Sequence, residues 1–251
     1  MCHEKRKDRR ITVEQGEERL PKVSVNLYTK FIKRLLDLGL SLIALILFSP
    51  VMAVISVLEL VFHGIPITFS TGRPGKDGKI FKMYKFRSMT NKKDEEGLLL
   101  PDEQRLTKFG KILRKTSLDE LPELFCILKG DMSVIGPRPL LTEYLPLYPP
   151  RYAMRHAVRP GLACFPLNRD KNSGPMTWRA QFEGDIWYIE HLNFITDVKM
   201  IFAIFKELFS PSESRVTGTR IPFTGDNLDD TRSYEEYVKL GLLGRYESIG
   251  K

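Results

Sequence analysis

The chain has 251 residues, of which 42% are hydrophobic, so it is long enough to bury a core, and we expect one large domain. Its 39 Lys and Arg residues against 31 Asp and Glu give a net charge of +8, which indicates anionic partners such as phosphorylated ligands or an anionic membrane surface. The three cysteines and four histidines are scattered, which argues against a disulfide framework, a zinc site or histidine-based catalysis. No groove-binding motif is recognisable, so we expect no nucleic-acid partner.

The N-terminal residues 1–28 are polar, and we expect them to form a disordered lead. A cleavable signal peptide would need an apolar region much nearer the N-terminus. Residues 35–62 are the one stretch that is long and apolar enough to be considered for a bilayer span.

A proline interrupts this apolar stretch near its middle. Pro50 removes one helical N–H and clashes with the carbonyl four residues earlier, while the hydroxyl of Ser49 can satisfy the freed backbone group. The pattern predicts a bent helix with two arms of about 20 Å, each too short to cross a hydrocarbon core of about 30 Å. Lys and Arg residues flank both ends, which suits two ends on the same, cytoplasmic side. We therefore favour a re-entrant hairpin at about residues 31–62; the alternatives are a kinked single span and a buried helix of a soluble core.

The remaining sequence predicts a mainly α fold with a small β-hairpin and interfacial amphipathic helices. Two β-prone runs at residues 66–71 and 79–89 flank a turn rich in Gly, Pro and Asp, which is typical of a hairpin. Residues 91–104 read as an exposed loop, and the chain after Ser210 is loop-like until a short helical pattern at 233–243. Helical signals cover residues 105–114, 119–128, 140–148, 177–191 and 194–209.

Two adjacent acids follow a serine at the start of one predicted helix. Ser117-x-x-Glu120 fits a capping box, in which the hydroxyl and the carboxylate satisfy free backbone N–H groups. Many cations in the same region also make Asp119 and Glu120 a candidate phosphate site, with a divalent cation bridging carboxylate and pyrophosphate. Neighbouring helical side chains point about 100° apart, so the two acids should have different roles. We expect the helix N-terminus to keep Asp119 ionised.

Four sequence features, in this order, resemble the bacterial monotopic phosphoglycosyl transferases, a sugar transferase family that begins glycan assembly on polyprenol phosphate. They are the Ser49-Pro50 pair, residues 72–89 (GRPGKDGKIFKMYKFRSM), residues 114–147 (RKTSLDELPELFCILKGDMSVIGPRPLLTEYLPL) and residues 155–161 (RHAVRPG). The resemblance implies a transferase domain at 29–210 and a C-terminal extension at 211–251.

The resemblance also implies an enzyme held in one leaflet of the bacterial inner membrane, at its cytoplasmic face, by a re-entrant helix broken at Ser49-Pro50. Such an enzyme transfers a sugar 1-phosphate from a UDP-sugar to undecaprenyl phosphate, releases UMP and requires Mg²⁺. Asp119 and Glu120 match the catalytic pair of the family. Asp119 would carry the phosphosugar on its carboxylate and contact Mg²⁺, while Glu120 would assist Mg²⁺ binding or orient the acceptor.

The resemblance assigns substrate binding to six cationic residues: Lys85, Arg87, Arg114, Arg138, Arg159 and Lys171. Pro137 and Pro139 flank Arg138 in a structural turn. The family run GITGWAQVNGRN is replaced here by residues 161–172 (GLACFPLNRDKN), which puts a lysine at the position of a phosphate-binding arginine. A lysine supplies charge but not a bidentate fork, so the contacts to the nucleotide sugar should differ.

Another class of protein remains open at this point. The same positive charge and amphipathic helices would suit a membrane-anchored scaffold that binds anionic lipids without catalysis. The altered segment at 161–172 favours a scaffold slightly, whereas the intact acid pair at 119–120 favours an enzyme.

Overall fold

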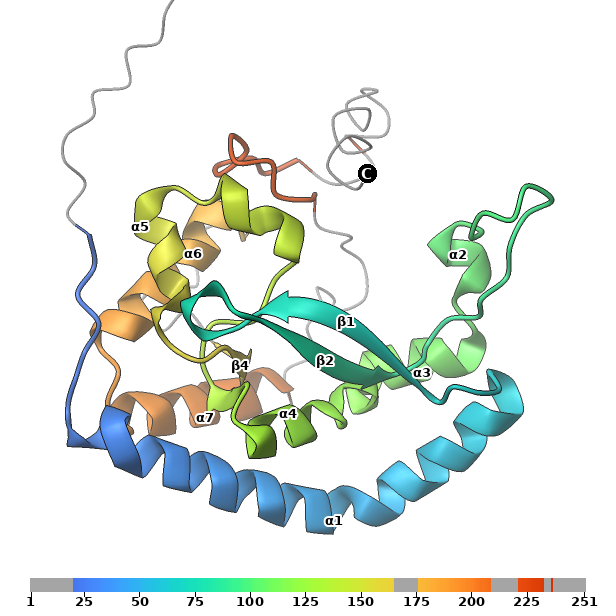
Figure 1. The fold of residues 1–251 in the computed structure, drawn as a ribbon, viewed down its shortest axis with the longest axis horizontal. Helices are drawn as coiled ribbons and strands as arrows, with labels where there is room; N and C mark the ends of the chain where they lie inside the picture. The colour runs from blue at the N-terminus through green and yellow to red at the C-terminus, as the bar shows by residue number, and fades with distance from the viewer. Residues whose placement is uncertain (1–19, 165–175, 209–220, 233–235, 237–251) are drawn as a thin grey trace, which may run out of the picture.

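The computed structural model describes residues 20–164, 176–208, 221–232 and 236 (Figure 1). The predicted helical pattern at 233–243, apart from residue 236, and most of the predicted N-terminal lead lie outside these residues. The described part is mainly helical with an antiparallel hairpin, as predicted. A long curved helix, α1, runs along one side, and the other elements lie on its concave side (Figure 1).

Helix α1 spans Lys33–Phe62 and continues from a π-helical turn at Tyr28–Ile32. It is bent, as predicted, but it continues through Pro50 instead of breaking there (Figure 1). The Ser49 hydroxyl donates a hydrogen bond of 2.8 Å to the carbonyl of Ile46, which is the acceptor that Pro50 cannot serve. Because the side chain replaces the missing N–H, the helix curves without interruption.

The surface of α1 is apolar where it is exposed and polar where it is buried. The 35 residues from Tyr28 to Phe62 are long and apolar enough to cross a membrane, and only 11% of the most apolar 18-residue window is buried. Asp37, Ser41 and Glu59 are among the few α1 side chains that face the protein. More than half of the surface is exposed for Leu35, Leu42, Ile43, Ile46, Leu47, Val54, Val57, Val61 and Phe62. This inverted pattern is typical of a helix in lipid rather than of a core helix of a soluble protein.

The hairpin pairs β1 (Thr68–Pro74) with β2 (Ile80–Phe86), with Arg73 opposite Phe81 and Phe69 opposite Lys85. Asp77 and Gly78 adopt left-handed backbone angles in the connecting turn, where Gly and Asp are favoured. Along β2, Phe81 and Met83 point inward and Lys85 follows on the same face.

The other helices are short apart from two near the C-terminus. A second small sheet, which the sequence did not predict, pairs β3 (Ser133–Ile135) with β4 (Gly161–Ala163) in parallel. The α-helices are α2 (Asp102–Arg105), α3 (Lys108–Thr116), α4 (Glu123–Lys129), α5 (Pro150–Ala153), α6 (Trp178–Glu190) and α7 (Phe194–Leu208). Single 3₁₀ segments cover Lys76–Gly78, Leu118–Glu120, Thr142–Leu147 and Met154–Ala157.

The predicted capping box at Ser117 is wrong. Ser117 has a φ of 56° and closes the C-terminus of α3, because its N–H bonds back to the carbonyl of Arg114. Its hydroxyl makes no capping bond to the following segment. That segment begins as the 3₁₀ turn Leu118–Glu120, and the regular helix starts only after Pro122.

An aromatic core holds α5, α6 and the described C-terminal residues together. Trp178 and Phe182 of α6 pack against Tyr144, Tyr148 and Phe223. Phe223 belongs to the predicted C-terminal extension, and it is fully buried. The described end of the predicted lead also joins the core, since Tyr28 is buried in it.

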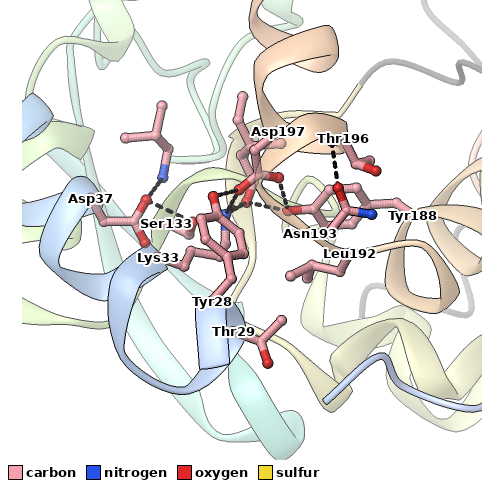
Figure 2. Close-up of polar contacts among 12 residues, drawn as sticks. Tyr28, Thr29, Lys33, Asp37, Ser133, Tyr188, Leu192, Asn193, Thr196 and Asp197 are labelled. Carbon is pink, nitrogen blue, oxygen red and sulfur yellow. Dashed lines mark hydrogen bonds and ion pairs between the residues drawn. The ribbon is translucent and has the colours of Figure 1, made fainter. Parts of the chain in front are cut away.

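A buried polar network fixes the N-terminal arm of α1 to the rest of the fold (Figure 2). Asp197 of α7 accepts hydrogen bonds from Tyr28 at 2.5 Å, from Lys33 at 2.6 Å and from Tyr188 at 2.7 Å. We call these four residues the Asp197 network. Nearby, Asp37 accepts from the Ser133 hydroxyl and from the backbone N–H of Val134. Helix α1 is therefore bonded to both α7 and β3.

Candidate active site

A cavity of about 540 Å³ opens between the hairpin, the segment after β2, α3 and the turn at Leu118–Glu120. Five cationic side chains and two carboxylates line it: Arg73, Lys85, Arg87, Arg105, Arg114, Asp119 and Glu120. The structure thus brings both predicted catalytic acids together with three of the predicted substrate-binding residues.

Close backbone packing brings α3 to this cavity. Gly110 lies so near the segment after β2 that an added Cβ would be 1.9 Å from the carbonyl oxygen of Ser88. Glycine therefore permits an approach that a larger residue would block. One turn later, Arg114 reaches the same segment and donates from Nε to the Ser88 hydroxyl at 2.8 Å. The left-handed backbone of Ser117 then turns the chain so that Asp119 and Glu120 face the cavity.

Glu120 is held by two cations. Lys85 Nζ lies 2.7 Å from Glu120 Oε1, and the same oxygen accepts a hydrogen bond from Arg138. Burial raises the pKa of Glu120, but Arg138 and Lys85 outweigh it, so that this pKa lies below its ordinary value. Lys85 also lies 3.1 Å from Glu123, whose pKa is raised because its carboxyl group is buried. Glu120 is thus a fixed anion within an ion-pair cluster.

Asp119 has a different environment. It is buried, and among the described residues it makes no ion pair. Burial and the neighbouring Glu120 charge raise its pKa above the ordinary value, against the opposing effects of Lys85 and Arg114. The pKa shift is thus opposite to the lowering that a helix N-terminus produces, because the regular helix begins only later and the carboxyl group is buried. The two acids therefore have opposite pKa shifts, and their different roles stay a prediction.

The other predicted binding residues do not all line this cavity. Arg87 lines the cavity, but one of its guanidinium nitrogens donates to the backbone carbonyls of His63 and Pro66, beside the C-terminal end of α1. Arg138 joins the site through Glu120 and also donates to the carbonyl of Leu162. Arg159 lines a separate cavity of about 390 Å³ near the hairpin turn. Lys171 lies outside the described residues.

Two prolines support the position of Arg138. Pro137 and Pro139 flank it directly after β3, and the carbonyl of Pro137 accepts a hydrogen bond from Gly161 of β4. Gly161 sits against the backbone of this turn, since an added Cβ would lie 2.2 Å from the nitrogen of Gly136. The turn is therefore tightly packed between the two short strands.

Sequence reasoning missed Arg73 and Glu123 as members of the site. Arg73 follows Phe69 and Thr71 at strand spacing, and all three line the cavity from one face of β1. That period of two was a signal available in the sequence. Glu123 lies three residues after Glu120, so it shares a helical face and binds the same lysine.

The donor set fits a Mg²⁺ ion that is held partly by substrate. The described residues include no group of three or more His, Cys, Asp or Glu placed to hold a metal together. Asp119 nevertheless offers a carboxylate without an ion pair inside a cavity. Mg²⁺ commonly uses one or two carboxylates together with phosphate oxygens, so Asp119 suits this mode and a cage made only of protein ligands is not required.

The bacterial sugar transferase family matches residues 28–211 of the chain. A Bacillus subtilis (strain 168) protein named as the uncharacterized sugar transferase EpsL is 42% identical over 199 residues, which make up 78% of this chain and 98% of that protein.

Two longer relatives have names that state a reaction. UDP-N-acetylgalactosamine-undecaprenyl-phosphate N-acetylgalactosaminephosphotransferase of Aeromonas hydrophila is 35% identical over 186 residues, 72% of this chain and 44% of that protein. UDP-glucose:undecaprenyl-phosphate glucose-1-phosphate transferase of Klebsiella pneumoniae is 37% identical over 189 residues, 72% of this chain and 41% of that protein. The chain therefore spans less than half the length of these two relatives. Because the family match covers most of the chain, including the whole cavity described above, the chain belongs to the bacterial sugar transferase family and is a transferase enzyme.

Proposed function

We propose that the chain transfers a sugar 1-phosphate from a UDP-sugar to undecaprenyl phosphate, releasing UMP, as the first membrane step in the assembly of a bacterial glycan. The observation that carries this proposal is the unpaired, buried carboxylate of Asp119 in a cavity lined by five cationic residues. Such a cavity suits two anionic phosphate substrates and a nucleophile that attacks one of them. The names of the Aeromonas and Klebsiella relatives support the reaction class.

In the first step, an oxygen of Asp119 attacks the β-phosphorus of the UDP-sugar. A bond forms between the carboxylate oxygen and phosphorus, the bond from phosphorus to the UMP oxygen breaks, and UMP leaves with the electron pair. The attacking form is the ionised carboxylate, and Lys85 and Arg114 favour it electrostatically. Covalent catalysis lets one site handle two bulky phosphate substrates in turn.

In the second step, a phosphate oxygen of undecaprenyl phosphate attacks the phosphosugar on Asp119. The new bond gives undecaprenyl diphosphosugar, and the bond to Asp119 breaks, which restores the carboxylate. Glu120 holds Lys85 and Arg138 beside the reacting group. Mg²⁺, when bound to Asp119 and phosphate oxygens, would neutralise the charge that develops on the phosphoryl group.

We also propose that α1 is re-entrant at the cytoplasmic face of the bacterial inner membrane, next to anionic lipids. Both ends of α1 are bonded to the same folded domain, which supports this topology. At the N-terminal end, Arg34 donates to the carbonyls of Ile127 and Leu128. At the C-terminal end, His63 hydrogen bonds to Glu59 and to Thr107, directly before α3. A helix that enters lipid between two such anchors has to return to the side from which it came.

The function is tested by incubating purified protein with Mg²⁺, undecaprenyl phosphate and each member of a panel of UDP-sugars, and by measuring UMP. We expect UMP release with at least one sugar, together with a lipid-linked sugar diphosphate. A folded, membrane-bound protein that releases no UMP from any UDP-sugar would refute the proposal.

The topology is tested by labelling single cysteines on both flanks of α1. In a variant whose native cysteines are replaced, Lys30→Cys and Ile65→Cys place exposed thiols before and after the apolar segment. We expect an impermeant reagent to label both in inverted vesicles and neither in intact cells. Labelling of the two positions from opposite faces would eliminate the re-entrant topology.

A further inference from the structure

We infer that Arg73 binds the α-phosphate of the UDP-sugar, the phosphate that leaves as part of UMP. This inference rests on the proposed function. It assigns one end of the cavity to each of the two substrates of the proposed reaction. The donor diphosphate occupies the end formed by Arg73, and the lipid phosphate occupies the end beside α1. Asp119 lines the same cavity and reacts with each in turn.

The first ground is that the half-buried Arg73 side chain holds a buried guanidinium nitrogen without a partner among the described residues. Its Nε atom is shielded from solvent and has no hydrogen-bond acceptor, and no described residue forms an ion pair with it. Burial and the nearby Arg138 charge lower its pKa, while Glu143 and Glu123 oppose the shift from a distance. A buried cationic donor without an acceptor is costly, so the position of this nitrogen indicates an anionic ligand that supplies the missing acceptor.

The second ground is that the other cations at this end are already engaged. Arg138 donates to Glu120 and to the carbonyl of Leu162. Lys85 lies between Glu120 and Glu123. Arg73 therefore contributes positive charge that the protein itself leaves uncompensated, and its planar fork matches two phosphate oxygens.

The third ground is the direction of β1 (Figure 1). The strand begins next to the C-terminal end of α1 and leads away from it. Arg73 lies five residues after Thr68, which corresponds to about 16 Å at about 3.3 Å per residue. Arg87 and Ser88 line the opposite end, where Arg87 bonds to the carbonyl of His63 at the end of α1. A lipid phosphate reaches the cavity from the membrane helix, so the remote end is left for the soluble nucleotide.

This position gives Arg73 a role in the departure of UMP. When the bond from the β-phosphorus to the UMP oxygen breaks, negative charge accumulates on the UMP phosphate. A guanidinium bound to that phosphate is attracted more strongly as the charge grows, so it promotes the first step as well as binding. It takes no part in the second step, because UMP has then left.

The test compares Arg73→Gln and Arg73→Lys with the wild type, and uses Lys82→Gln as a matched control. Lys82 is an exposed cation on the same hairpin and does not line the cavity. UMP release without acceptor reports the first step, steady-state rates at varied acceptor report the second, and calorimetry with UMP reports binding alone. For Arg73→Gln we expect kcat/KM for the UDP-sugar and the affinity for UMP to fall about 10- to 100-fold, with an unchanged kcat/KM for undecaprenyl phosphate. Arg73→Lys should give values of kcat/KM and UMP affinity between those of Arg73→Gln and the wild type. Lys82→Gln should stay within about twofold of the wild type in both.

Several outcomes would overturn the inference. Equal affinity of wild type and Arg73→Gln for UMP would do so, whether or not the wild type turns over. A fall in kcat/KM for undecaprenyl phosphate instead of kcat/KM for the UDP-sugar would also do so. A clear loss of thermal stability in Arg73→Gln would do so too, because a structural role would then explain the residue. Failure of the proposed function is distinguishable, since the wild type would then release no UMP while its affinity for UMP still reports on Arg73.

Discussion

Two buried polar regions of this enzyme differ in how fully their charges are satisfied. In the Asp197 network, the carboxylate accepts three hydrogen bonds, from Tyr28, Lys33 and Tyr188 (Figure 2). In the cavity, Asp119 makes no ion pair with a described residue and the Arg73 guanidinium makes no hydrogen bond. Both regions hold a buried aspartate beside cations, yet only the cavity leaves groups of both signs open to a ligand.

The difference separates a structural use of charge from a catalytic one. A buried carboxylate that is fully hydrogen bonded stabilises one arrangement, and removing it leaves its partners unpaired. A buried carboxylate without partners costs stability, and it persists where a reaction needs it. We therefore expect substitutions in the Asp197 network to reduce stability, and substitutions at Asp119 to reduce activity.

The largest expected effect is the loss of activity in Asp119→Asn. Removal of the nucleophile should lower the rate of UMP release about 10⁴-fold or more. The melting temperature should stay equal or rise slightly, because an amide is neutral and a buried acid with a raised pKa is removed. Asp229→Asn, which changes a surface aspartate paired with Arg179, is the control and should keep full activity. A phosphosugar adduct that still forms on Asp119→Asn would refute the assignment of the nucleophile.

The opposite result is expected for Asp197→Asn. The change removes the charge that Lys33 and two tyrosine hydroxyls share, so the free energy of unfolding should fall by about 3 kcal/mol. Thermal unfolding in detergent measures this loss. The rate of UMP release per folded molecule, measured well below the melting temperature, should stay within about threefold of the wild type. A large loss of rate without a loss of stability would remove the distinction between the two regions.

Lys85→Gln should show both effects, because Lys85 lies in the cavity but is fully ion paired. Its loss leaves Glu120 and the buried Glu123 facing each other without their shared cation. We expect a loss of about 2 kcal/mol in stability and a loss of about 10-fold in kcat/KM. Lys82→Gln, three residues earlier on the exposed side of β2, is the matched control. A change confined to activity would indicate that the ion pairs of Lys85 are not structural.

The sequence predicts the parts of the fold that depend on local rules. The hairpin follows from two β-prone runs around a Gly- and Asp-rich turn. The bend of α1 follows from Pro50, and the sequence also identifies Ser49 as the donor that replaces the missing N–H. The predicted catalytic pair was identified by resemblance, and the structure places both acids in one cavity.

Predictions that depend on distant contacts were less successful. Ser117 fits a capping box in sequence, but the close packing of Gly110 against Ser88 directs α3 so that Ser117 ends it in a left-handed turn. The raised pKa of Asp119 depends on burial of its carboxyl group in the folded chain, which no local pattern contains. Arg73 was missed although the period of two along β1 places it on the face of Phe69 and Thr71, because the cavity beside that face is formed by elements distant in sequence.

The smallest expected effect concerns one unsatisfied atom at the edge of the aromatic core. His156 Nε2 is buried and has no hydrogen-bond partner, and the ring packs edge-on against Tyr148. Burial, aided by the adjacent Arg155 and opposed by a hydrogen bond to the Gly75 backbone, lowers the pKa of His156 to about 4. In the unfolded chain its pKa is about 6.5, so the unfolded state takes up a proton first as the pH falls.

This imbalance makes the stability dependent on pH in a defined window. The stability that neutral His156 contributes is fully present above about pH 6.5 and is lost as the pH falls from about 6.5 towards 4. At pH 5.5 the loss in the free energy of unfolding is about 1 kcal/mol. The melting temperature of the wild type should therefore fall more between pH 7.5 and 5.5 than that of His156→Gln, which has no group to protonate there. Equal slopes for the two proteins would contradict the prediction. The rate of UMP release from folded protein should be the same for wild type and His156→Gln at each pH. His156 lies at the edge of the aromatic core and does not line the cavity, so its protonation affects stability and not the reaction.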